Sequence, residues 1–500
     1  MAHSLPASPS LEHLRNQAKA LLKAIRAQDP SARDRLKRYL PNLGEPARLS
    51  NAQFVIAREH GFPSWPRLRT YVDSVTGVRA SRRRPLSADI DWFSDRAEGL
   101  SRSHRDAIPT TLAQIREFHP GFSGLSDGAI RGAEFTLEDA RIAVAREHGF
   151  DSWRQFGRHL KDLSAGKTAE PFLTAFDAIK DNDSSRLAHL LEQDPSLVNA
   201  PGTNGNTLLN LAVSCRQPDC VEALLAAGAD INRANKYGWT PLHQAAYTNQ
   251  GEIARRFIQE GGSLQLSARG DGGTPLVQAL FWGHRDLAED LARHGVFPCN
   301  LRVAAGLGRL DLVESFFDSS GKLTAEAGHQ REFYRPHPGF PTCTPTDNPQ
   351  EILDDALLYA AKNGRINILQ FLVDRGANVD GAPCRLRALN WVASNEKLID
   401  VMEWLLDHGA DVHGCAGSGA PIRPTPLHEA ASSGNLAGVR LLLERGGDNT
   451  LRESEYNSTP LGWANHFGRN ETRDYLIEHA ALDSEDAAEF GKPGGESGNA

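Results

Sequence analysis

Two repeated stretches contain the residues best suited to chemistry, because IAREHGF (56–62) and VAREHGF (144–150) each place Arg, Glu and His side by side. A histidine beside a carboxylate could take part in acid–base catalysis or bind a metal ion. No further ligand follows at a suitable spacing around His60 or His148. We therefore predict neither a catalytic nor a metal-binding role for them.

A corner between two helices accounts for the shared letters better. Gly61 and Gly149 would stand just past a helix end, in a left-handed conformation that glycine adopts at little cost. The phenylalanine that follows would pack back on the helix it has left. Ser64 and Ser152 would then cap the next helix. Both stretches are interpreted as structural corners.

The segment 321–353 is a second place where chemistry is conceivable. It contains His329, His337 and Cys343, but it lacks a fourth ligand or a compact metal motif. The chain also lacks GxSxG, HExxH, GxxxxGK[ST] and a strand-linked GxGxxG. We expect no catalytic residue, no metal and no cofactor, although an enzyme that uses this segment remains an alternative.

Composition places the chain among globular proteins of more than one domain. It has 500 residues, of which 40% are hydrophobic and 24% charged. The six cysteines form no CxxC pair, and neither a secretory signal nor an 18-residue apolar run is visible. These features predict a cytoplasmic protein with no membrane segment.

The net charge of −8 conceals an uneven distribution. Residues 1–165 hold 26 basic and 19 acidic side chains, whereas the remainder holds 29 basic and 44 acidic ones. Arg82, Arg83 and Arg84 form the densest basic run. A nucleic-acid-associated adaptor is therefore an alternative, but no reader motif accompanies the basic residues, and nucleic acid is not the expected partner.

A repeat with a period near 33 begins at about residue 205. Thr-Pro-Leu-His occurs at 240–243 and 425–428, and Thr-Pro-Leu occurs at 274–276 and 459–461. The threonine would cap a helix, and proline suits the first helical position because its missing N–H has no partner there. His243 and His428 are expected to bond across to the adjacent turn. The Gly that closes each unit would end its second helix.

This pattern resembles the ankyrin repeat over roughly 170–480. The resemblance implies an all-α solenoid of helix–turn–helix repeats with β-hairpin tips. The repeated AREHGF stretches, with the alignment of residues 18–41 on 97–120, predict two related small helical modules before it. We expect repeats to start near residues 172, 205, 238, 272, 299, 354, 387, 423 and 457. Asn210 and Asn390 replace the histidine. The outermost units would act as polar caps, since a repeat cannot bury its faces alone.

The expected domain order is a first module, an Arg/Pro/Ser linker, a second module, the array with one insertion, and a disordered tail. The corresponding ranges are 1–76, 77–94, 95–165, 170–481 with its insertion at 321–353, and 482–500. The AREHGF/SW modules are similar to modules that precede ankyrin arrays in bacterial proteins of unassigned function. That resemblance suggests a bacterial protein and indicates no activity.

In the ankyrin family, partners bind along the concave face, at the hairpin tips and at exposed positions of each first helix. The resemblance therefore implies a non-enzymatic scaffold that binds a protein partner, and we expect the chain to be a monomer. Large aromatic side chains at these positions would suit a binding hot spot. The candidate partner-binding residues are Lys236, Tyr237, Trp239, Tyr247, Thr248, Phe281, Trp282, His466 and Phe467. An open alternative is that Phe281 or Trp282 packs against a neighbouring helix or under the insertion.

Overall fold

The protein is helical throughout the part of the chain that the computed structural model describes. The described residues are 11–40, 47–60, 65, 68, 83–270, 272–295, 297, 299–331, 345–383, 387–414, 424–454 and 456–479. Within these ranges there is no strand, and the only bridges are isolated ones, at Arg84 with Gly202 and at Phe317 with Leu323. The all-α prediction is confirmed.

The first helical module has three described helices, which are α1 (Leu11–Arg26), α2 (Pro30–Tyr39) and α3 (Leu49–Glu59). Asp29 caps α2 by accepting the Ala32 N–H at 2.8 Å, and Pro30 takes the first helical position. These helices enclose a small core of their own. The predicted corner residues Gly61, Phe62 and Ser64 lie outside the described residues.

The second module is larger. Its helices are α5 (Ile90–Arg105), α6 (Pro109–Phe118), η1 (Pro120–Phe122), α7 (Asp127–Gly132), α8 (Leu137–Glu147) and α9 (Trp153–Ser164). The predicted 77–94 linker overlaps this module, because α5 already begins at Ile90 with Asp89 as its cap. Fully buried Phe93, Ile115 and Phe156 lie in the module's core.

The second AREHGF stretch forms the predicted corner. Gly149 ends α8 at φ +84°, in the left-handed region. The Phe150 N–H donates to the Ala145 carbonyl at 3.1 Å, which turns the chain back on α8. The Ser152 hydroxyl caps α9 by accepting the Gln155 N–H at 3.4 Å.

Nine helix pairs follow within the described residues, and each pair matches one predicted repeat. The first helices are α10 (Pro171–Lys180), α12 (Leu208–Ser214), α14 (Pro241–Tyr247), α16 (Pro275–Phe281), α18 (Leu301–Leu307), α20 (Pro349–Lys362), α22 (Ala388–Ala393), α24 (Pro426–Ser433) and α26 (Pro460–His466). The second helices are α11 (Ser184–Gln193), α13 (Pro218–Ala226), α15 (Gly251–Gln259), α17 (Arg285–His294), α19 (Leu310–Ser315), α21 (Ile366–Val373), α23 (Ile399–Asp407), α25 (Leu436–Glu444) and α27 (Asn470–His479). Short 3-10 helices η2 (Pro195–Asn199), η3 (Thr203–Gly205), η4 (Ala325–Gly328) and η6 (Glu396–Leu398) lie in the connections.

The threonine and histidine of the repeat have the predicted roles. His243 Nδ1 accepts the Thr240 N–H at 3.2 Å, and its Nε2 donates to the Gly273 carbonyl of the next connection at 3.0 Å. His428 repeats this arrangement with Thr425 and the Ser458 carbonyl. Each histidine therefore ties a helix start to the following repeat.

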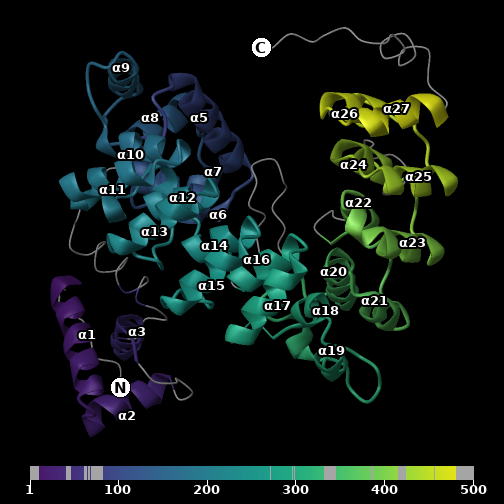
Figure 1. The fold of residues 1–500 in the computed structure, drawn as a ribbon, viewed down its shortest axis with the longest axis horizontal. Helices are drawn as coiled ribbons and strands as arrows, with labels where there is room; N and C mark the ends of the chain where they lie inside the picture. Colours follow the sequence, from purple (N-terminus) through teal and green to yellow (C-terminus); the bar gives the residue numbers. More distant parts are fainter. Residues whose placement is uncertain are drawn as a thin grey trace.

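The array consists of two arms that meet at a corner (Figure 1). The first arm contains α10 to α17, the second contains α20 to α27, and α18 and α19 lie where the direction changes. In the second arm the first helices face the first arm, and the second helices lie outside (Figure 1). Two separate hydrophobic cores correspond closely to the two arms.

At the corner, the sixth repeat reaches past the fifth to touch the fourth. Asn363, at the end of α20, donates to the Leu280 carbonyl of α16 at 2.9 Å. Arg365 donates to the Gly306 carbonyl of α18 at 3.1 Å and pairs with Glu289 of α17 at 2.6 Å. A Cβ on Gly306 would lie 3.1 Å from Leu280, so glycine allows this close approach.

The predicted insertion at 321–353 is shorter at its C-terminal end than expected. Asn348 caps α20 and Pro349 begins it, so residues 349–353 belong to the sixth repeat. The sequence signal for this start, Asn followed by Pro, lies inside the segment predicted as the insertion. Phe333, Tyr334 and Phe340, the aromatic residues by which the insertion could extend a recognition surface, lie with the rest of 332–344 outside the described residues.

Candidate functional site

One position recurs on the first helices, four residues after the cap, and we call its members the inner stripe. They include Gln244, Gln278, Trp391, Glu429 and Trp463. The Trp391 ring contacts the rings of Phe281 and Trp282, with centroids 5.5 Å apart in each case. The stripe of the second arm therefore faces the inside of the bend, where a partner could contact several repeats.

The connections of the first repeats are covered by the second module. Glu147, the acid of the second Arg-Glu-His, accepts the backbone N–H of Asn204 at 3.0 Å. His148 contacts the Thr203 hydroxyl at 2.8 Å through Nε2. Lys236, in the third repeat's connection, donates to Gln114 of α6 at 2.5 Å. The motif thus joins the module to the array, a role that its letters alone did not reveal.

Glu147 is the centre of a buried charged network. Its carboxylate pairs with Arg96 at 2.7 Å and accepts the Gln114 amide at 3.0 Å, and its side chain is only 1% exposed. Burial alone would raise the pKa of Glu147, but the charges of Arg96, Lys236 and His148 outweigh it and hold the pKa far below its usual range. Burial lowers the pKa of Lys236. The carboxylate is therefore ionised and compensated.

Three candidate residues are consequently engaged by the chain itself. Lys236 and Tyr237 are half-buried under the second module, and the Arg269 guanidinium lies 4.5 Å from the Tyr237 ring centre. Trp239 is 6% exposed and contacts Tyr247 edge to face. The expectation that this tip is open is wrong for Trp239, because the large indole fills the junction between repeats.

Phe281 and Trp282 help to fill the corner between the arms, and Tyr247 packs beside Trp282. Phe281 is 5% exposed, and the Lys362 amine lies 3.5 Å from the centres of both the Phe281 and Trp391 rings. Trp282 and Tyr247 are half-buried and contact each other edge to face. The expectation of an exposed Phe281 is wrong, and the alternative that it packs against neighbouring helices is confirmed. The reason is the bend, which brings the fourth repeat against the sixth and seventh.

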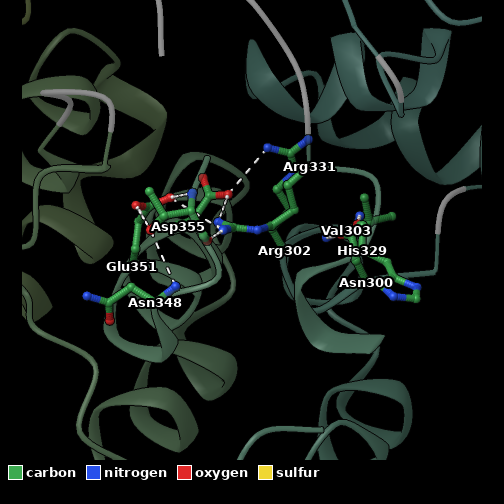
Figure 2. Close-up of polar contacts among 9 residues, drawn as sticks. Asn300, Arg302, Val303, His329, Arg331, Asn348, Glu351 and Asp355 are labelled. Carbon is green, nitrogen blue, oxygen red and sulfur yellow. Dashed lines mark hydrogen bonds and ion pairs between the residues drawn. The ribbon is translucent and has the colours of Figure 1, made fainter. Parts of the chain in front are cut away.

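Polar groups complete the corner (Figure 2). Arg302 of α18 and Arg331 both point at Asp355 of α20, at 3.3 and 3.2 Å from the same carboxylate oxygen. Arg331 also pairs with Glu351 at 3.4 Å. Both arginines are almost fully buried. These pairs fix the start of α20 against α18 and so help to set the angle between the arms.

The last repeat leaves more of its inner face open. Phe467 is 49% exposed and contacts the rings of His466 and Trp463. Thr248, by contrast, donates its hydroxyl to the Gln244 carbonyl at 2.7 Å and is half-buried. Of the nine candidates, His466 and Phe467 are therefore the exposed ones.

Sequence reasoning missed three members of the inner stripe, namely Trp391, Glu429 and Trp463. All three are half-buried on consecutive first helices of the second arm. The signal was available, because each stands four residues after the residue that precedes its first helix. The stripe position lies just before the alanine pair of the repeat, whereas the predicted binding positions follow that pair.

Of the residues behind the alternative functions, Arg83 and Arg84 are described and lie near acidic side chains of the chain itself. Arg83 lies 3.9 Å from Glu117, and Arg84 pairs with Glu170 at 3.2 Å, so both serve internal contacts. Arg82, His337 and Cys343 lie outside the described residues. In the described part of the chain, no three His, Cys, Asp or Glu side chains come together as a metal site would require. No described helix has the length and apolar character needed to cross a membrane.

Comparison with known proteins adds a family assignment. A family model described as ankyrin repeats (three copies) matches residues 175–268, 233–301, 301–414 and 389–486. RelA-associated inhibitor from Mus musculus is 31% identical over 135 residues, which are 27% of this chain and 15% of that protein. SMC5-SMC6 complex localization factor protein 1 from Bos taurus is 35% identical over 140 residues, 27% of this chain and 13% of that protein. Protein PhlB from Serratia liquefaciens is 30% identical over 131 residues, 25% of this chain and 57% of that protein. The chain therefore spans only part of each of these relatives.

Proposed function

Because the chain belongs to the ankyrin-repeat family, we propose that it is a non-enzymatic scaffold that holds a protein partner on the inner face of its second arm. Repeats of this kind stack so that equivalent positions form one continuous surface suited to protein–protein interaction. Two relatives are named as an inhibitor and as a localization factor, which agrees with binding rather than catalysis.

The second arm is favoured because its last repeats are more exposed than the first repeats, which the chain's own second module covers. The tips of the first repeats contact the chain's own second module, through Glu147 and Lys236. The inner face of the last repeats carries half-buried Trp463 and exposed Phe467. Partly exposed aromatic residues beside polar ones are typical of the anchors that dominate protein interfaces.

A capture experiment with paired variants tests the proposal. Tagged full-length chain is used to isolate partners from its native cells, beside a Trp463→Ser/Phe467→Ser double variant. We expect at least one protein to be captured by the native chain and to bind the double variant about 30-fold more weakly, as loss of a hot spot implies.

The matched control is Trp404→Ser, because Trp404 is also half-buried but belongs to α23 on the outer side of the second arm. This variant should keep the partner. Equal capture by the native chain and by the folded double variant would contradict the proposed surface.

A further inference from the structure

Glu429 occupies an unusual place in the second arm. It belongs to the inner stripe on α24, and α24 packs between α22 and α26. Trp391 and Trp463 hold the same stripe position on those two neighbours. Packed helices lie about 8–10 Å apart, so the two indoles occupy the equivalent positions one helix away from Glu429 on either side.

Among the described residues, no cation pairs with the Glu429 carboxylate. Within the described residues, no hydrogen bond or ion pair reaches it, and burial is the one influence on its pKa, which rises to about 7. The neighbouring His428 is committed to Thr425 and to the Ser458 carbonyl. A carboxylate partly withdrawn from water without a partner is destabilised, and an incoming cation would relieve this.

The aromatic neighbours suit the same ligand. A tryptophan face attracts a positive charge within about 6 Å of its ring centre. Trp391 already illustrates this attraction, because the Lys362 amine lies 3.5 Å from its centre. Beyond residue 165, moreover, acidic side chains outnumber basic ones by 44 to 29, which favours a basic partner.

We propose that Glu429, with Trp391 and Trp463 as walls, receives an arginine or lysine side chain from a basic segment of the bound partner. This inference rests on the proposed scaffold function and specifies the chemistry that its second arm recognises. The carboxylate provides the ionic contact, and the indoles shield it from water.

The test uses the full-length chain and fluorescein-labelled glycine–serine peptides that carry four arginines, four glutamines or four glutamates. Fluorescence anisotropy should report binding of the arginine peptide and little binding of the other two. Glu429→Gln should weaken the arginine peptide about 10-fold or more, as loss of a charge-assisted bond implies. Glu471→Gln, at an exposed position of α27, is the matched control and should leave binding unchanged.

A stability readout separates recognition from a structural role. If Glu429 serves the ligand, Glu429→Gln should unfold at the same or a higher urea concentration than the native chain, because an uncompensated carboxylate is removed. Equal arginine-peptide binding by native chain and variant, no arginine-peptide binding by the native chain, or a destabilised variant would each overturn the inference. A captured partner that is lost from the Trp463/Phe467 variant but kept by Glu429→Gln would overturn it while leaving the scaffold proposal intact.

Discussion

The two AREHGF modules share a motif but use its acid at different depths. In the first module, Glu59 is 13% exposed and pairs with Arg35, which is 40% exposed, at 2.7 Å. In the second, Glu147 is 1% exposed and pairs with Arg96, which is 13% exposed, also at 2.7 Å. In the first module the glutamate therefore forms a partly solvated ion pair within the module. In the second it is buried and joins the module to the array.

The two acids receive their positive charge from different helices. Residues 18–41 align with 97–120 at an offset of 79, which places Arg35 opposite Gln114. Gln114 still bonds to the acid at 3.0 Å, but the charge now comes from Arg96 on α5. The Gln114 carbonyl oxygen accepts from Lys236 of the array. The two copies therefore differ both in the helix that carries the arginine and in whether the acid contacts the array.

Removal of the Glu147 side chain should cause the largest loss of stability among the variants that compare the two modules. Glu147→Ala leaves Arg96 and Lys236 buried without their anion, a loss expected to cost about 3–5 kcal/mol. Urea denaturation should show the fall, and hydrogen exchange should quicken at the amides of α8 and at Asn204. Glu147→Gln keeps the shape and should retain only part of the stability. A loss below 1 kcal/mol for the alanine variant would contradict the anchor role.

Low pH should destabilise the array through His243 rather than through the carboxylate of Glu147. Burial lowers the pKa of His243 to about 4 from its usual 6.5, so the unfolded state binds the proton more readily. The stability that His243 contributes is complete above pH 6.5 and falls by about 3 kcal/mol as pH drops towards 4.

The measurement for this prediction is the urea midpoint at pH 7 and at pH 5. His243→Asn serves as the variant, because Asn210 already fills the equivalent place and caps with Thr207. The variant should show a smaller drop between the two pH values than the native chain. An identical drop in both would contradict the prediction.

Substitution of Gly149, the residue that ends α8, should have an intermediate effect on stability. Gly149→Ala forces a side chain into the left-handed region at φ +84° and should cost about 1–2 kcal/mol. Gly99→Ala is the matched control, since Gly99 lies in α5 with nothing within 4 Å of its added Cβ. That control should stabilise the module by about 0.5–1 kcal/mol. Thermal unfolding of both variants checks the opposite signs.

The smallest effect is expected in the first module. Glu59→Ala removes a pair whose arginine is substantially solvated, so the loss should stay below about 1 kcal/mol. The urea midpoint should move little, and added salt should reduce the difference further. If the loss equalled that of Glu147→Ala, burial would not be what separates the two copies.

Much of the fold was predictable because its signals are local. The repeats, the capping by Thr240, the bonds of His243 and the stop at Gly149 each involve a few neighbouring residues or one repeat of separation. The candidate site was harder to predict. Trp239 and Phe281 have the residue type of a binding anchor, but their burial depends on neighbours that the repeat pattern does not specify.

The sequence by itself therefore determined the helix pairs, their period and their ends, since capping and helix termination act over a few residues. The tertiary structure alone decided where the array bends and which surfaces stay open. Those features depend on contacts between distant segments, such as Lys236 with Gln114, 122 positions apart, and Asn363 with Leu280, 83 apart. No local pattern encodes such pairings, because many side chains of the same type could satisfy each partner until the whole chain is packed.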